Sequence, residues 1–194
     1  MSKGMLLPRF EGLSGVSRHK PNSKSDKLLR RMSAYIELID LGLSQASMQK
    51  IDPYAINQVT RFAGEFQKTS VKATALGWFK DSLRGELIAN IAYNLYCRIA
   101  PNNINVSKEP DPQDVLAAYK AFVLMYPFYL QDEDGARGLE LNRFFGLLDA
   151  IRDHKTVAGK CSKCSTRYIR EASRRMNTCP HCALSSRSKI QISN

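Results

Sequence analysis

Residues 161–182, CSKCSTRYIREASRRMNTCPHC, contain four of the five cysteines of this 194-residue chain. They form two pairs, Cys161 with Cys164 and Cys179 with Cys182, and each pair encloses two residues. A pair with this spacing turns a tight loop that aims both sulfurs at one ion, and two pairs complete a tetrahedron with Zn–S distances of about 2.3 Å. The spacing therefore predicts a structural Zn²⁺ site. With four protein ligands it leaves no open position for catalysis.

Paired cysteines also occur in disulfides, redox motifs and iron–sulfur sites. Disulfides fit a reducing compartment poorly, and a thioredoxin-like pair needs a βαβ unit that the sequence does not show. A four-cysteine iron–sulfur cluster has the same ligand count, and spacing does not separate it from zinc. His181 lies inside the second pair as a competing ligand, although the four-cysteine set is simpler. The fifth cysteine, Cys97, falls in a helical pattern and is expected to be a buried small hydrophobe.

The net charge of +11 is concentrated at the two ends of the chain. Residues 1–31 carry eight Lys/Arg and two acids, and residues 154–194 carry nine and one, whereas residues 32–153 carry twelve and fifteen. Basic ends suit a polyanion, because neutralising phosphates releases condensed counterions. A pair of solvated tails is the alternative interpretation.

The basic side chains near the cysteines exceed what a thiolate-bound metal needs for charge balance. They predict a metal-stiffened basic surface that contacts phosphates, which fixes register without reading bases. The candidate phosphate contacts there are Lys160, Lys163, Arg167, Arg170, Arg174 and Arg175.

The pattern of apolar residues predicts a mainly α-helical bundle with a small C-terminal four-cysteine zinc-binding module. We expect a flexible basic arm over 1–25, a helical domain over 26–155 and the basic zinc module over 156–194. The helical domain begins near Ser25 and Asp26, and its first helix stops at Gly42. The further expected helices are 44–51, 53–66, 79–99, 112–126 and 138–153.

Two sets of side chains are expected in the core. In the 79–99 helix, the apolar face is expected to contain Leu83, Leu87, Ile91 and Leu95, widened by Ile88, Ala92 and Ile99. The aromatic residues expected in the core are Tyr93, Tyr96, Tyr119, Phe122, Tyr126, Phe128, Phe144 and Phe145.

The two short helices around Asp52 have the outline of a helix-turn-helix. Asp52 is suited to cap the second helix, and Pro53 suits its first position. In such a motif the second helix enters the major groove, where Asn and Gln read adenine and Arg reads guanine. An ordinary helical hairpin has the same outline. The candidate DNA contacts on this helix and beyond it are Tyr54, Asn57, Gln58, Arg61, Lys68 and Lys72.

The sequence also bears on the compartment and on catalysis. It has no run of about 18 apolar residues and no apolar stretch typical of an export signal, so we expect a cytoplasmic protein. It shows no phosphate loop, nucleophile–base arrangement or open metal site, so we expect no enzymatic activity.

The order of several passages resembles that of the FlhC family of flagellar transcriptional activators. The resemblance spans about residues 28–183 and is most specific in its last passage. The passages are LGLSQASMQ (41–49), AYNLY (92–96), DVLAAYKAFVLMYP (114–127) and ELNRFFGLLDAIRDHKTVAGKCSKC (140–164), followed by CPHC (179–182). The resemblance implies that the four paired cysteines bind zinc. It also implies hetero-oligomers with an FlhD-type protein partner, and recruitment of RNA polymerase to promoter DNA.

Three differences favour one branch of such activators. The basic arm is longer than in the flagellar proteins, and the loop between the cysteine pairs and the tail are shorter. The chain is more similar to the AcaC and SetC type, which controls transfer genes of conjugative plasmids and integrative elements. The alternative is an RNA-binding or protein-assembly module with a structural zinc site, which single-stranded RNA would contact through exposed aromatics. The cysteine-rich stretch offers only Tyr168 for this.

Overall fold

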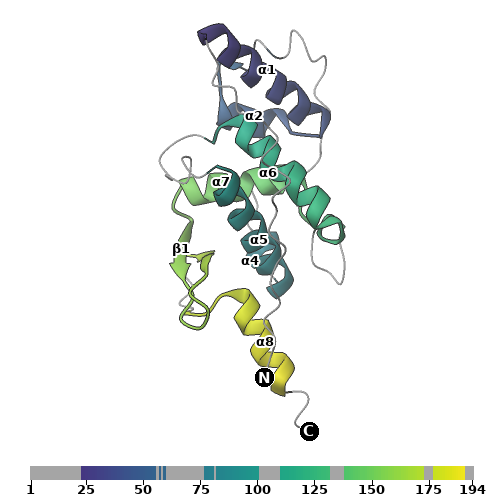
Figure 1. Cartoon of the computed structure of the whole chain (residues 1–194). Coiled ribbons are helices and arrows are strands. Elements are labelled where there is room, and N and C mark those ends of the chain that lie inside the picture. Colours follow the sequence, from purple (N-terminus) through teal and green to yellow (C-terminus); the bar gives the residue numbers. More distant parts are fainter. Residues whose placement is uncertain are drawn as a thin grey trace.

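A computed structural model of the chain describes residues 23–55, 57, 59, 77–80, 82–100, 110–131, 138–172 and 177–190. Across these residues the fold is mostly helical with one small sheet, and a four-cysteine cluster follows at the C-terminal side (Figure 1). The expected fold class is therefore confirmed. The helices are α1 (Lys24–Asp40), α2 (Gln45–Ile51), α4 (Gly77–Lys80), α5 (Leu83–Ile99), α6 (Pro112–Met125), the 3-10 helix η2 (Pro127–Tyr129), α7 (Leu141–Arg152) and α8 (Pro180–Ile190). The strands are β1 (Thr156–Lys160) and β2 (Arg167–Glu171).

The first helix begins two residues before the expected start and ends where expected. The Ser23 hydroxyl accepts a hydrogen bond from the backbone N–H of Asp26, so Ser23 is the N-cap. Gly42 has a φ of 93°, a left-handed conformation that glycine adopts without strain. The backbone N–H of Leu43 reaches the carbonyl of Leu38, which closes the C-terminus. Of the predicted arm, residues 1–22 lie outside the described residues.

The expected cap at Asp52 is confirmed. Its carboxylate accepts hydrogen bonds from the backbone N–H groups of Tyr54 and Ala55, at 3.1 and 3.0 Å. Residues 55, 57 and 59 are helical, and Val59 is buried in the core. The expected start at Pro53 is two residues too early, because Pro53 and Tyr54 form a turn and the helical residues begin at Ala55. Residues 56, 58 and 60–66 of the expected helix lie outside the described residues.

Helix α7 lies at the centre of the fold and is buried on nearly all sides. The ring of Phe144 contacts the rings of Tyr96 from α5 and Tyr119 from α6. The expected start at 138 is too early. The N–H of Leu139 donates to the carbonyl of Tyr129, and a Cβ on Gly138 would meet the Leu130 backbone at 2.3 Å. These two residues therefore lie against the backbone of residues 129–131, and the helix starts afterwards.

The helix expected over 79–99 is divided into α4 and α5. Ser82 caps α5 by accepting a hydrogen bond from the backbone N–H of Gly85 at 2.9 Å. A Cβ on Gly85 would lie 2.1 Å from the carbonyl oxygen of Trp78, so this glycine lets α4 approach α5 closely. The helix is thus divided because Ser82 starts a new helix at α5 and because Gly85 allows α4 to pack closely against it.

The buried face of α5 agrees with the expected one at Ile88 and Ala92 and differs at the four leucine and isoleucine positions of the expected stripe. The residues buried in the core are Ile88, Ala89, Ala92, Tyr93 and Tyr96. The expected stripe is only half-buried. Small Ala89 and Ala92 allow close packing against the neighbouring helices, so the helix presents a different face to the core. The half-buried positions are Leu83, Leu87, Ile91 and Leu95.

The expected aromatic core is largely confirmed, with one error. Phe128 is 80% exposed in η2 and does not join the core. Tyr126 is half-buried and stacks on Tyr129. Cys97, expected to be buried, is half-buried against the core, and burial raises the pKa of its thiol.

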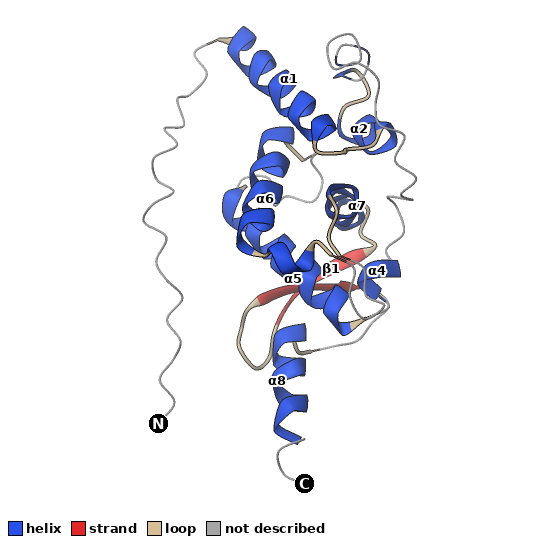
Figure 2. Ribbon diagram, turned by 90° about the vertical axis from the view of Figure 1, so that its right-hand side faces the viewer, coloured by secondary structure: helices blue, strands red, loops and turns tan. Residues whose placement is uncertain are grey.

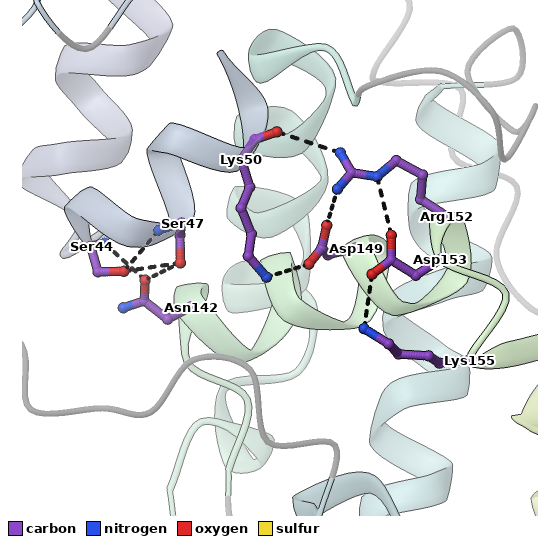
Figure 3. A network of polar contacts seen from close by, with 8 residues as sticks. All are labelled: Ser44, Ser47, Lys50, Asn142, Asp149, Arg152, Asp153 and Lys155. Atoms are coloured by element: carbon purple, nitrogen blue, oxygen red, sulfur yellow. Dashed lines mark hydrogen bonds and ion pairs between the residues drawn. The ribbon is translucent and has the colours of Figure 1, made fainter. Parts of the chain in front are cut away.

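A polar cluster joins α2 to α7 (Figure 3). The Asn142 side chain accepts hydrogen bonds from the Ser44 backbone N–H and the Ser47 hydroxyl, and donates one to the Gly42 carbonyl. Further along α7, the buried carboxylate of Asp149 forms ion pairs with Lys50 and Arg152. The cluster positions the α1–α2 end of the molecule on the central helix.

Replacing Asp149 by Asn should lower the free energy of unfolding by about 1–3 kcal/mol, because two cations then face each other without the buried acid. Urea unfolding followed by circular dichroism measures this. The matched control is Asp153→Asn, which removes an exposed acid paired with Lys155 and should change stability much less. Equal losses for the two variants would refute the role given to Asp149.

Candidate metal centre

The four cysteines are placed by a β-hairpin and a helix. Strands β1 and β2 pair antiparallel, with Thr156 opposite Glu171 and Lys160 opposite Arg167. The first cysteine pair lies in the turn between the strands, and the second begins α8. Figure 2 shows this hairpin packed beside α5, with α8 projecting away from the α1–α2 end. We call residues 156–190 the four-cysteine module.

Backbone hydrogen bonds shape both cysteine loops. In the first loop the N–H of Cys161 donates to the Thr166 carbonyl, and the N–H of Ser165 donates back to the Cys161 carbonyl. Ser165 has a φ of 60°, the left-handed conformation that such a reversal requires. The N–H of Ser162 donates to the Asn177 carbonyl at 2.9 Å and joins the first loop to the second.

The sulfurs are close enough together to share one ion. All four lie within 4.8 Å of one another, and those of Cys164 and Cys179 are 3.6 Å apart. Four sulfurs bound to one Zn²⁺ at about 2.3 Å lie about 3.8 Å apart at the edges of a tetrahedron. The cysteines are therefore positioned to bind a metal ion, and the donor set suits a soft, tetrahedral one.

The thiols have very different pKa values. The backbone N–H of Cys179 donates to the sulfur of Cys161 at 3.2 Å, and this is the main reason that the pKa of Cys161 falls to about 6. Hydrogen bonding with Cys164 is the main reason that the pKa of Cys182 rises to about 12. Hydrogen bonding with Thr166 also lowers the pKa of Cys164, whereas burial raises the pKa of Cys179. Two of the four thiols are thus disposed to ionise, and ionisation of Cys179 and Cys182 is opposed. A metal cation bound among the four sulfurs stabilises their thiolate forms and so favours ionisation of all four cysteines.

A small apolar shell surrounds the sulfurs. Tyr168 is buried against Cys161 and Cys179. A Cβ on Gly159, which lies opposite Tyr168 across the hairpin, would sit 3.3 Å from its ring. The glycine therefore leaves the space in which this ring covers the metal centre.

Asn90 of α5 holds the module to the helical body, a role that the sequence pattern did not predict. Its buried side chain accepts a hydrogen bond from the backbone N–H of Ile169 at 2.7 Å and donates one to the carbonyl of the same residue at 3.1 Å. One turn later, Asn94 donates to the Arg167 carbonyl at 3.3 Å. The available signal was two asparagines four residues apart in the uncharged stretch 87–97 of this helix.

The structure places the predicted phosphate contacts of the module as follows. Lys160 and Arg167 are both exposed and directly opposite each other in the hairpin. Lys163 is exposed, and its ammonium donates to the Ser186 hydroxyl at 2.7 Å. Arg170 is half-buried. The two remaining contacts, Arg174 and Arg175, lie outside the described residues.

The predicted base-reading residues are not brought to the module. Tyr54 is 86% exposed and Asn57 is exposed, both just after α2. Figure 1 places α1 and α2 at one end of the molecule and α8 at the other. The two predicted DNA-contacting sets are therefore separated along its long axis. The other members of the first set, Gln58, Arg61, Lys68 and Lys72, lie outside the described residues.

Comparison with known families finds no family model that matches the chain, and comparison with curated proteins finds no matching sequence. None of the described helices is long and apolar enough to cross a lipid bilayer.

Asn90→Ala should lower the free energy of unfolding by about 2–4 kcal/mol, because it leaves the buried N–H and carbonyl of Ile169 without partners. Asn94→Ala, which removes one longer bond at a partly exposed site, should cost less than about 1 kcal/mol. Urea unfolding of both variants gives the comparison. Similar small losses for both would show that Asn90 does not hold the module in place.

Cys179→Ser should abolish tight metal binding, because three thiolates and a hydroxyl make a much weaker donor set. Metal content after purification and dialysis, measured by plasma mass spectrometry, checks this. Cys97→Ser is the matched control, since Cys97 lies outside the cluster, and it should keep the metal of the unmodified chain. Full metal content in Cys179→Ser would contradict the assigned ligand set.

Proposed function

We propose that this chain is a sequence-specific DNA-binding transcriptional activator whose C-terminal module is stiffened by structural zinc. One observation carries the proposal. Lys160 and Arg167 occupy directly opposed positions of a two-stranded hairpin, and both are exposed. Like charges placed opposite each other destabilise a hairpin. An anionic ligand turns this repulsion into attraction, and DNA phosphates are such a ligand.

Zinc is the metal that we propose. A tetrahedral set of four sulfurs is typical of Zn²⁺ or of iron–sulfur chemistry. The four ligands come from a hairpin turn and a helix start, an arrangement that suits a single ion with a structural role. No open coordination position remains on such an ion, which agrees with a protein that is not an enzyme.

Base reading is assigned to the helix that Asp52 caps. Tyr54 and Asn57 are exposed near its start, where a recognition helix contacts base edges. These residues lie far from the four-cysteine module. One DNA duplex would therefore contact both this helix and the basic residues of the module only by lying along the long axis of the molecule. We infer that the reading helix supplies specificity and that the module supplies phosphate contacts.

The resemblance supports the remaining parts of the proposal: an FlhD-type partner, RNA polymerase recruitment, a cytoplasmic location, and transfer or flagellar genes as targets. The alternative RNA-binding module has less support. Tyr168, the only Phe, Trp or Tyr in the described part of the module, is buried, so its ring cannot stack on an unpaired base.

The experiment uses duplexes enriched by the protein from a random pool, with and without an FlhD-type partner, and scrambled duplexes of the same composition. Binding is measured by fluorescence anisotropy at several salt concentrations. Lys160→Gln should weaken binding to both duplexes and reduce the slope of log K against log salt by about 1, as loss of one phosphate contact requires.

Lys155→Gln is the matched control, because Lys155 is also exposed but pairs with Asp153 before β1 begins. It should leave the slope unchanged. Failure to enrich any sequence, or equal slopes for Lys160→Gln and the unmodified chain, would overturn the proposal.

A further inference from the structure

The half-buried stripe of α5 lines a pocket of about 500 Å³ between the helical body and the four-cysteine module. Its floor is apolar, and the end of α6 forms one wall. The second cysteine loop forms another wall through Pro180 and His181. The apolar lining residues are Leu87, Ile91, Leu95, Met125 and Tyr126.

The spacing of the stripe suits a helix as occupant. Leu87, Ile91 and Leu95 are each four residues apart on α5, so they form one ridge along about two helical turns. Ridges of this kind pack into the grooves of a second helix. None of the three is among the fully buried residues of α5, and Ile91 and Leu95 pack against the edge of the main core. The ridge therefore has the form of a helix-packing surface beside the core.

Further apolar side chains are exposed at the end of α6, next to the pocket residue Met125. Leu124 is 82% exposed, Phe128 in the following η2 is 80% exposed, and the pocket residue Met125 is 39% exposed. Adjacent apolar side chains left in water at this level are typical of protein interaction sites.

The charges around the pocket indicate the chemistry of the occupant. Among the described residues that line it, the charged side chains are Arg98 and Arg167, both exposed, and none is acidic. An acidic segment is attracted to such a rim. A second copy of the chain, with its net charge of +11, is repelled by it.

We propose that this pocket binds an amphipathic helix of a partner protein, whose apolar stripe packs on the α5 ridge and whose flanking acids face Arg98 and Arg167. The apolar floor disfavours nucleic acid, which would leave these side chains without apolar partners. The inference concerns a protein surface and does not rest on DNA binding.

The test uses two synthetic helical peptides of about 18 residues with the same leucine stripe, one flanked by Glu and one by Lys. Titration calorimetry with the full chain should show the Glu peptide binding at least about tenfold more tightly, with the difference shrinking at high salt. Arg98→Gln should reduce the preference for Glu. Met125→Gln, at a partly exposed position, should weaken both peptides.

Lys160→Gln separates this proposal from the proposed function. It should leave peptide binding unchanged while weakening DNA, whereas Met125→Gln should leave DNA binding unchanged. Three results would overturn the inference: no binding of either peptide, equal affinity for both, or self-association of the chain that Met125→Gln abolishes. The last result would show that a second copy occupies the pocket.

Discussion

The paired hydrogen bonds between the Asn90 amide and the backbone of Ile169 determine how the four-cysteine module lies on the helical body. Strand β2 has a strand partner on one edge only, and at Ile169 a helix side chain satisfies the other edge. Buried backbone groups without partners are costly. The hairpin therefore has one position against α5 in which the backbone groups of Ile169 are hydrogen-bonded. That position determines where the cysteine loops lie and forms the pocket beside α5.

Strand β2 connects two cores through neighbouring residues. Ile169 packs into the main hydrophobic core, whereas Tyr168 packs with the cysteines. Adjacent side chains of a strand point to opposite faces, so one strand serves both cores. The four cysteines and the helical body thus have separate structural roles. A metal ion bound by the cysteines would hold the two cysteine loops together, and α5 holds the strand between them in place.

Much of this arrangement could be predicted from the sequence, because its signals are local. The cysteine spacing identified the cluster, the Asp52 cap was correct, and Gly42 ended α1 as expected. The face of α5 could not be chosen from periodicity, since Leu87 and Ile88 both belong to acceptable apolar stripes. Ala89 and Ala92 select the buried face because they allow close packing, and this packing exists only when α6 and α7 are in place. The role of Asn90 depends on a strand 79 residues away, which no local pattern reveals.

Amide hydrogen exchange of the metal-loaded and chelated protein tests most directly whether the module has these two separate attachments. Chelation is expected to remove protection at Ser162, whose N–H joins the two loops. Ile169, held by Asn90 and the main core, should keep slower exchange than Ser162, and α7 should not change. Equally fast exchange at Ser162 and Ile169 after chelation, or no effect of chelation at all, would contradict the account.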